Sequence, residues 1–414
     1  MSPSNVDFKR LSQEELNAVI DRHENYTAGR NGGLKANLAY HDLTGLSFAK
    51  RNLSDADFTG SILCDANMQG TKLDRAVLFC VDMRNTDLRG ASLKRADLRG
   101  ASMRGAVLVG SNMEGVDLRE GSLANADGSG NLQAAHKNLT IADKGGANLA
   151  GSNLSEAKLS GAVAIASNFT DATMKNVRLR NADLTGSNFS GTNLERSDFE
   201  NCTLQDVILR GAVITGTKIN LSEISKENQE GILTEQAVGK STKDLPMPME
   251  DLLRLHKIWL ESNGKSGKGL DVSRYDLRKG VDFSGACLTM MRAHNATLFG
   301  VNFMKAQLQS ADMKSSDLRQ AVFELADMRG IQLHGTRLNS ANFKQAQLQP
   351  LALGGKRSLK SNLSKASLQF ADFSGANLAQ VDFRDADLTD ANLRGADLTG
   401  ADLTGAILKG TLRD

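Results

Sequence analysis

The sequence is poor in several residue types that would mark familiar classes of protein. It holds only 4 Pro and 4 Cys in 414 residues, and aromatic residues make up 5%. The Cys residues lack CxxC spacing, so they indicate neither a zinc site nor a disulfide framework. No apolar run reaches membrane-spanning length, and the first residues lack the apolar core of a signal peptide. These absences favour a reduced, cytoplasmic protein with no membrane association.

An excess of charge of one sign is also missing. The chain has 50 Lys and Arg against 48 Asp and Glu, a formal net charge of +2 at pH 7. A nearly neutral protein has no global field that attracts nucleic acid or an anionic membrane. The composition therefore disfavours direct nucleic-acid binding.

The sequence is instead dominated by a period of five residues. Between Ala371 and Leu408 a large apolar residue returns at every fifth position, a small residue lies two before it, and Asp or Asn lies between them. This period fits neither an α-helix nor a plain strand. Residues two apart in an extended segment point the same way, so the small and the large residue face one interior. The next two positions, rich in Gly, Ser, Thr and Arg, must turn the chain.

The period covers two arrays, which we predict as domains at residues 34–219 and 270–414. It lapses in Gly-rich stretches at 124–148 and 350–362, and each lapse predicts a loop or irregular coil extruded from an array. Residues 220–269 lack the period and predict a linker followed by a helix.

Each array is preceded by a predicted helix. Ser12 and Glu15 form a capping box, so a helix begins within residues 1–33. The second helix follows Pro248, with acidic residues in its first turn. Both helices carry an apolar stripe, and the matching residues are Val19, His23 and Tyr26 in the first helix and Leu252, His256 and Trp259 in the second. The chain is therefore predicted to duplicate a helix-plus-array module, in which each helix caps an exposed edge.

The A(D/N)LXX pattern, as at Leu388 and Leu398, resembles the pentapeptide-repeat family. The resemblance implies an all-β solenoid, a right-handed quadrilateral β-helix with four repeats in each twenty-residue coil. It would form two arrays, each preceded by a short capping α-helix, with the large residues filling the interior. The predicted core residues include Leu38, Phe58, Leu98, Phe169, Leu184, Phe303, Phe343, Phe383 and Leu398.

Outward positions supply the candidate partner surface. Its residues are Val77, Phe79, Arg84, Arg104, Asp382, Asp387 and Asp402. The two apolar residues either bind a partner or lie beneath the N-terminal segment. The two Arg belong to a belt of basic residues with interleaved Asp, which favours a charge-paired surface over an anion site. The three Asp belong to acidic C-terminal coils, whose end predicts a homodimer contact.

No residue pattern indicates catalysis. His23 and His256 lie on apolar helix faces, where packing is favoured over metal binding because no second ligand lies at a suitable spacing. The segment Val238–Thr242 lacks the first Gly of a phosphate-binding loop. A packed interior leaves no pocket, so we expect no enzyme, cofactor or metal. The alternative is an enzyme that uses the 124–148 loop or the segment between the arrays.

The sequence thus predicts a non-enzymatic scaffold that binds another protein along a lateral face or through its loops. The alternative role comes from the resemblance, because topoisomerase-protecting members of the family are thought to imitate DNA with an acidic surface. Such a protein would regulate or protect a type II topoisomerase, DNA gyrase. The acidity of the last coils fits this alternative, whereas the net charge and the basic belt do not.

Overall fold

Each repeat pairs with the repeat one coil further along the chain. Parallel bridges join Asn37 to Asp57 and Asp57 to Val77, and the same spacing of twenty residues recurs through both arrays. Four five-residue repeats therefore complete one coil, and every coil hydrogen-bonds to the next along its four sides. The result is a β-helix whose strands are single bridging residues between corners.

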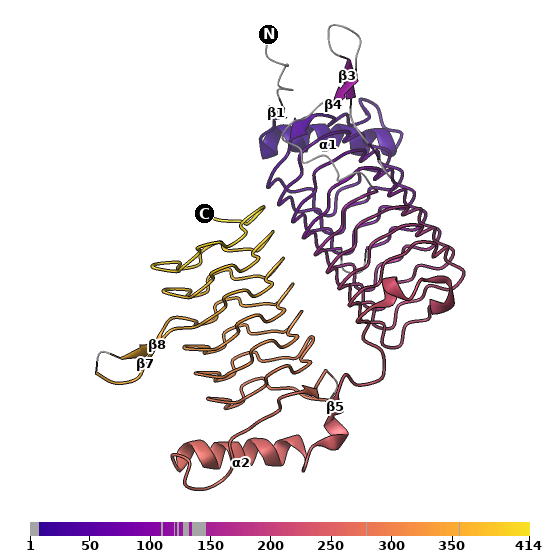
Figure 1. Ribbon diagram of the computed structural model, residues 1–414. Coiled ribbons are helices and arrows are strands. Elements are labelled where there is room, and N and C mark those ends of the chain that lie inside the picture. Colours follow the sequence, from indigo (N-terminus) through magenta and orange to yellow (C-terminus); the bar gives the residue numbers. More distant parts are fainter. Residues whose placement is uncertain are drawn as a thin grey trace. The chain divides into compact units, whose positions relative to one another are not determined.

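This computed structural model divides into two units, residues 1–235 (unit 1) and 236–414 (unit 2). In Figure 1 each unit is a ladder of stacked coils. The structure describes residues 8–108, 111–119, 121, 124–126, 132–134, 146–278, 280–355 and 357–414.

At each of the two interruptions of the five-residue period, extra residues are inserted between repeats that pair in neighbouring coils. At the first, Ser102 pairs with Asn148, and strands β3 (Ala124–Ala126) and β4 (Leu132–Ala134) form an antiparallel pair. Most of the predicted 124–148 loop lies outside the described residues. At the second, an antiparallel hairpin forms from the two short strands β7 (Leu351–Ala352) and β8 (Ser358–Leu359).

The corner of each repeat explains its polar residues. In most repeats the residue two after the large residue, here called the corner residue, has a positive φ, as at Asp55 (67°) and Gly60 (65°). This left-handed conformation favours Gly, Asn and Asp. The outward Asp or Asn accepts a hydrogen bond from the backbone beyond the large residue, as when the N–H of Thr59 donates to Oδ1 of Asp57 at 2.9 Å. The Asp or Asn of the pattern therefore fixes the turn.

The interior of each unit is one continuous apolar column. In unit 2 five phenyl rings stack along one side, with centroids 4.5–5.2 Å apart: Phe283, Phe303, Phe323, Phe343 and Phe373. Of the nine predicted core residues, eight are buried. Leu398 is only half-buried, because it belongs to the last coil and no described coil stacks on it.

Both units begin with the same succession of elements. In unit 1, β1 (Lys9–Arg10) pairs in parallel with β2 (His41–Asp42), and α1 (Gln13–Thr27) lies between them in the chain. In unit 2, β5 (Lys240–Ser241) pairs with β6 (Tyr275–Asp276) in the same way, with the short 3-10 helix η3 (Thr242–Asp244) and α2 (Met249–Glu261) between them. The helices predicted after Ser12 and Pro248 are confirmed.

Unit 1 extends further than its repeats. Two 3-10 helices follow the last repeat, η1 (Leu221–Glu223) and η2 (Glu227–Gln229). Ile224 and Leu233 are buried, and Leu233 pairs with Val213 of the last coil. The segment predicted as a linker from residue 220 therefore packs on unit 1 as far as residue 235, because its apolar residues cover that coil.

Candidate functional site

The basic belt of unit 1 is held by its own carboxylates. Arg84 donates to Asp82 through Nε (2.9 Å) and Nη2 (2.7 Å), and Arg89 and Asp87 repeat this geometry. The Asp precedes and the Arg follows one inward residue, so both side chains point outward together. The hydrogen bonds that Arg84 donates to Asp82 raise the pKa of Arg84. These two arginines of the belt are thus paired with carboxylates, and half-buried Arg104 lies one coil beyond Arg84.

The apolar pair Val77 and Phe79 is half-buried. The guanidinium of Arg99 lies 5.2 Å from the centroid of the Phe79 ring, a cation–π contact. A Cβ at Gly121 would lie 2.7 Å from the same ring, so Phe79 packs closely against this backbone. Described coils of unit 1 thus supply the contacts of Phe79.

The acidic residues of the last coils divide between two sides. Asp382 and Asp402 bridge in one column, whereas Asp387 lies in the next column along the coil. Arg384 binds Asp382 at 2.7 Å and lies 3.7 Å from Asp402, and its hydrogen bonds lower the pKa of Asp382. Neutral and basic residues interrupt the column, which runs Asp271, Arg292, Asp312, Gln332, Asn362, Asp382 and Asp402. These acidic residues therefore form no unbroken stripe.

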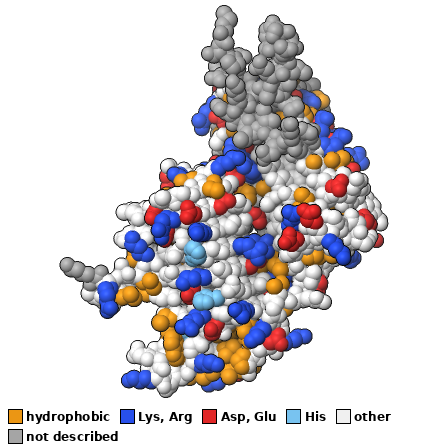
Figure 2. All heavy atoms as spheres, viewed as in Figure 1, with side chains coloured by type: hydrophobic (Ala, Val, Ile, Leu, Met, Phe, Trp, Pro, Cys, Tyr) orange, Lys and Arg blue, Asp and Glu red, His pale blue; other side chains and the backbone are white. Residues whose placement is uncertain are grey.

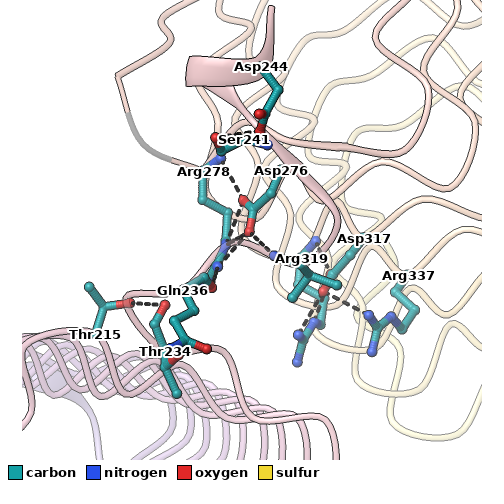
Figure 3. A network of polar contacts seen from close by, with 11 residues as sticks. Thr215, Thr234, Gln236, Ser241, Asp244, Asp276, Arg278, Asp317, Arg319 and Arg337 are labelled. Carbon is teal, nitrogen blue, oxygen red and sulfur yellow. Dashed lines mark hydrogen bonds and ion pairs between the residues drawn. The ribbon is translucent and has the colours of Figure 1, made fainter.

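A network of hydrogen bonds and ion pairs joins the first residues of unit 2 to its first coils (Figure 3). Asp276 binds Arg278 at 2.6 Å and accepts the N–H of Val238 at 2.9 Å. Asp317 binds Arg319 and Arg337, each at 2.8 Å. Burial raises the pKa of Asp317, but the two guanidinium groups outweigh it and keep the pKa below its usual value. The segment that resembled a phosphate-binding loop is therefore β5 and the start of η3, tied to the first coil.

One side of unit 2 carries a column of outward residues that is mostly uncharged and in which Gln recurs, and we call it the glutamine face. Its outward residues are Cys287, Gln307, Asp327, Gln347, Asn377 and Asp397. Leu325 is the corner residue just before this face, and Met290 is the corner residue just after it. Both have a positive φ, and their exposed fractions are 42% and 53%.

The β7–β8 hairpin borders the same face. Leu351 and Leu359 pack over Gly330, which shares its corner with Met290, and Leu353 in the hairpin is exposed. The repeat pattern alone does not predict this surface, because it constrains the interior residues and leaves the corner positions variable. The available signal was a large apolar residue at a position where Gly or Asn is usual.

The two helix histidines make matching contacts. Buried His23 accepts the N–H of Ala36 at Nδ1 (3.0 Å), and its Nε2 lies 3.0 Å from the carbonyl of Ser54. Buried His256 accepts the N–H of Leu270 at 3.0 Å. Burial lowers the pKa of both rings. Among the described residues no group of three or more His, Cys, Asp and Glu could hold a metal ion.

Helices of membrane-spanning length and apolarity are absent from the described part of the chain.

Several solved structures of pentapeptide repeat proteins resemble this chain. HetL of Nostoc sp. PCC 7120, a pentapeptide repeat protein involved in heterocyst differentiation regulation, is 21% identical, with 96% of this chain and 95% of HetL covered and a TM-score of 0.16. The pentapeptide repeat protein Rfr23 of Cyanothece 51142 is 26% identical, with 30% and 87% covered and a TM-score of 0.18. Full-length QnrB1, a plasmid-mediated fluoroquinolone resistance protein, is 14% identical, with 49% and 93% covered and a TM-score of 0.21. No curated protein matches significantly.

The family model for pentapeptide repeats matches most of the chain in eight copies. They cover residues 36–78, 80–128, 145–181, 178–216, 279–314, 316–349, 361–400 and 371–410. The chain belongs to the pentapeptide-repeat family, and its fold is the right-handed β-helix of that family.

Proposed function

We propose that this protein is a non-enzymatic scaffold that binds another protein along the glutamine face of unit 2. The observation that carries the proposal is the pair of exposed apolar corner residues beside that face, Met290 and Leu325. A left-handed conformation costs a residue with a side chain about 1–2 kcal/mol relative to its usual conformation. Strained residues that persist on a surface favour a functional role.

The composition of the face supports the same proposal. Gln307 and Gln347 are uncharged, and Asp327 is paired with Arg329 at 2.6 Å. The centres of protein interfaces are depleted in charged residues and hold exposed apolar anchors. Leu353 of the hairpin would extend the apolar border.

Substituting glycine at these two corners separates folding from binding. We expect Met290→Gly with Leu325→Gly to keep the fold and to raise its stability by about 0.5 kcal/mol per site, because Gly adopts positive φ without strain but loses more freedom on folding. Binding should weaken at least about tenfold through the loss of two anchors. Crosslinking in the native cell followed by mass spectrometry would identify the partner, and titration with the purified partner would measure its affinity.

Phe370→Gly is the matched control. Phe370 is also a corner residue with positive φ (59°), but its corner does not border the glutamine face. It should relieve the same strain and leave binding unchanged. If the double variant captures the same proteins in the same yield as the wild type, the glutamine face is not the binding surface.

We further propose that α1 and α2 cap their arrays. Side chains of α1 satisfy backbone groups of the first coil: Gln13 bonds both the N–H and the carbonyl of Ser47, and Glu24 accepts the N–H of Asn52 at 2.9 Å. Such bonds supply partners that an edge strand otherwise lacks. The domain assignment at 1–33, 34–219, 220–269 and 270–414 stays a proposal on the same basis.

The predicted partner surfaces also remain proposals. Leu398, Leu403 and Leu408 of the last coil are only partly buried, which supports a homodimer contact at that end. For Phe79, Arg84 and Asp382, the packing and ion pairs described above favour structural roles beside any contact with a partner. Val77, Arg104, Asp387 and Asp402 stay proposed contact residues.

The DNA-mimicking alternative makes a different prediction. It is supported by the stacked Asp382 and Asp402, whereas Arg384 between them and Arg292 in the same column oppose it. A scaffold of the proposed kind should leave the supercoiling activity of purified DNA gyrase unchanged at micromolar concentration. Inhibition of supercoiling, or protection of gyrase from a fluoroquinolone, that disappears in Asp382→Lys with Asp402→Lys would favour the mimic.

A further inference from the structure

The two helices at the starts of the units bury their apolar residues to different extents. α1 fully buries Leu16, Ile20 and His23. α2 is richer in apolar residues, yet among its side chains only His256 is fully buried. The others are half-buried or exposed, namely Met249, Leu252, Leu253, Leu255, Ile258, Trp259 and Leu260. The coil of unit 2 therefore accounts for only part of the apolar surface of α2.

Backbone contacts align the two helices residue by residue. The N–H of Leu34 donates to the carbonyl of Arg22 after α1, and the N–H of Lys268 donates to the carbonyl of Leu255 after α2. Arg22 and Leu255 therefore occupy the same place, immediately before the matching histidines. Three residues further, Asn25 of α1 corresponds to Ile258 of α2.

Leu255 and Ile258 of α2 correspond to the polar residues Arg22 and Asn25 of α1, whereas Trp259 corresponds to Tyr26. Ile258 is 36% exposed, and Leu255 and Trp259 are half-buried. Hydrophobic side chains gather over α2 at the lower end of the view in Figure 2. A helix that only caps a coil needs no apolar residue at these positions, as α1 shows. Their replacement by Leu and Ile points to a further contact.

Lysines border this apolar surface. Lys265 and Lys268 are exposed and have no ion pair within the described residues. Their loop is held beside the helix, because Ser262 of the helix end bonds the N–H and the carbonyl of Ser266. The acidic residues Asp251 and Glu261 are already paired with basic residues of α2 itself. The unpaired charge next to Leu255 and Ile258 is therefore positive.

We propose that Leu255, Ile258, Trp259, Lys265 and Lys268, here called the α2 patch, bind an amphipathic helix of a partner protein whose apolar stripe is bordered by Asp or Glu. α2 has 13 residues, about 20 Å of helix, which suits the anchors of a helix laid along it. The inference adds a second, specific contact to the proposed scaffold. It does not depend on the glutamine face.

The only Trp of the chain reports on this patch. Trp259 lies on α2 and its environment changes when the patch is covered. The probe is a Trp-free peptide of about 18 residues, long enough to form a helix, with a Leu stripe bordered by Glu. We expect it to shift the emission of Trp259 in the full-length protein to the blue and to protect it from acrylamide. The same peptide with Lys in place of Glu should bind about fivefold or more weakly, and the difference should shrink in high salt.

The matched variant gives α2 the residues of α1. Leu255→Arg with Ile258→Asn should fold, because α1 carries these residues at the aligned positions, and should abolish the response to the Glu-bordered peptide. Lys265→Glu with Lys268→Glu should fold and reverse the preference between the two peptides. Circular dichroism checks folding of each variant.

Three outcomes would overturn the proposal. A response to phosphatidylserine vesicles but to neither peptide would make the patch a membrane-binding surface. A shift of Trp259 emission with rising protein concentration alone would assign the patch to a second copy. No response to any of these would leave the patch without a ligand of the proposed chemistry. Loss of partner binding in the glutamine-face variants, with the peptide response intact, would leave this inference standing on its own.

Discussion

A Phe323→Ala variant is expected to lose about 3–5 kcal/mol of the free energy of unfolding of unit 2. Phe323 is fully buried in the middle of the phenyl stack, with its ring centroid 5.0 Å from those of both Phe303 and Phe343. Truncation removes the burial of one ring and leaves a cavity between two rigid coils. It also removes two stacked pairs, each of which contributes about 0.5–1.5 kcal/mol beyond the buried area.

The loss should be local at first, because each coil of a solenoid contacts only its neighbours. Urea unfolding followed by circular dichroism measures the total loss, and hydrogen exchange should show faster opening of the coils next to residue 323. Phe323→Leu is the control, since Leu393 ends the same interior column in the native chain. It should cost about 1 kcal/mol. Equal stability of the Ala variant and the wild type would mean that the stack collapses to fill the space.

The period of five predicts most of this fold because it acts on every coil alike. A large residue at each fifth position, such as Phe58 or Phe343, must point inward wherever the coil closes, so burial followed from spacing alone. The sequence predicts that the Asp and Arg residues of the belt pair, but not the geometry of each pair. Arg84 was expected to be charge-paired, but the two-pronged bond to Asp82 follows from the corner geometry, which the sequence did not display.

The candidate surfaces were less predictable, for a physical reason. Burial of an interior residue is imposed by the repeat, whereas exposure of Met290 or Leu325 depends on the conformation of one corner. The helices show the same limit. The pattern of α2 indicated an apolar stripe that includes Leu255 and Trp259, but only His256 of α2 is fully buried. Whether an apolar helix face caps a coil or binds a partner therefore depends on what packs against it, and the periodicity of the sequence does not give this.

The stability of unit 2 is expected to fall as the pH drops below about 6.5, before its carboxylates titrate. Nδ1 of His256 accepts the N–H of Leu270, so this nitrogen must be unprotonated in the folded protein. Burial lowers the pKa of His256 from its ordinary value of 6.5, and the carbonyl of Thr289 only partly opposes it. The unfolded chain therefore binds the proton more tightly than the folded chain. The stability that neutral His256 contributes is complete above pH 6.5 and is lost as the pH falls through the folded pKa, by up to about 1.4 kcal/mol per pH unit.

His23 should give unit 1 the same dependence. Its Nδ1 accepts the N–H of Ala36, and burial lowers its pKa first of all. Asp55 and Glu24 nearby raise this pKa, and Lys35 lowers it. The fall in stability of unit 1 should also begin near pH 6.5, the ordinary pKa of the unfolded imidazole, and end at the folded pKa of His23.

The measurement is the midpoint of urea unfolding between about pH 8 and pH 5.5, a range that lies above the titration of most carboxylates. His256→Gln should be less stable than the wild type at pH 8, because it loses the stacking on Trp259, whose ring centroid lies 5.7 Å away. It should lose its pH dependence in unit 2 while unit 1 keeps its own. His41→Gln, which removes a half-buried histidine of β2 and leaves both capping helices unchanged, is the control. A wild-type midpoint that stays constant down to pH 5.5 would show that protonation of the two rings does not weaken their contacts with the first coil. The apolar residues and the carboxylates of the helices would then be what stabilises each cap.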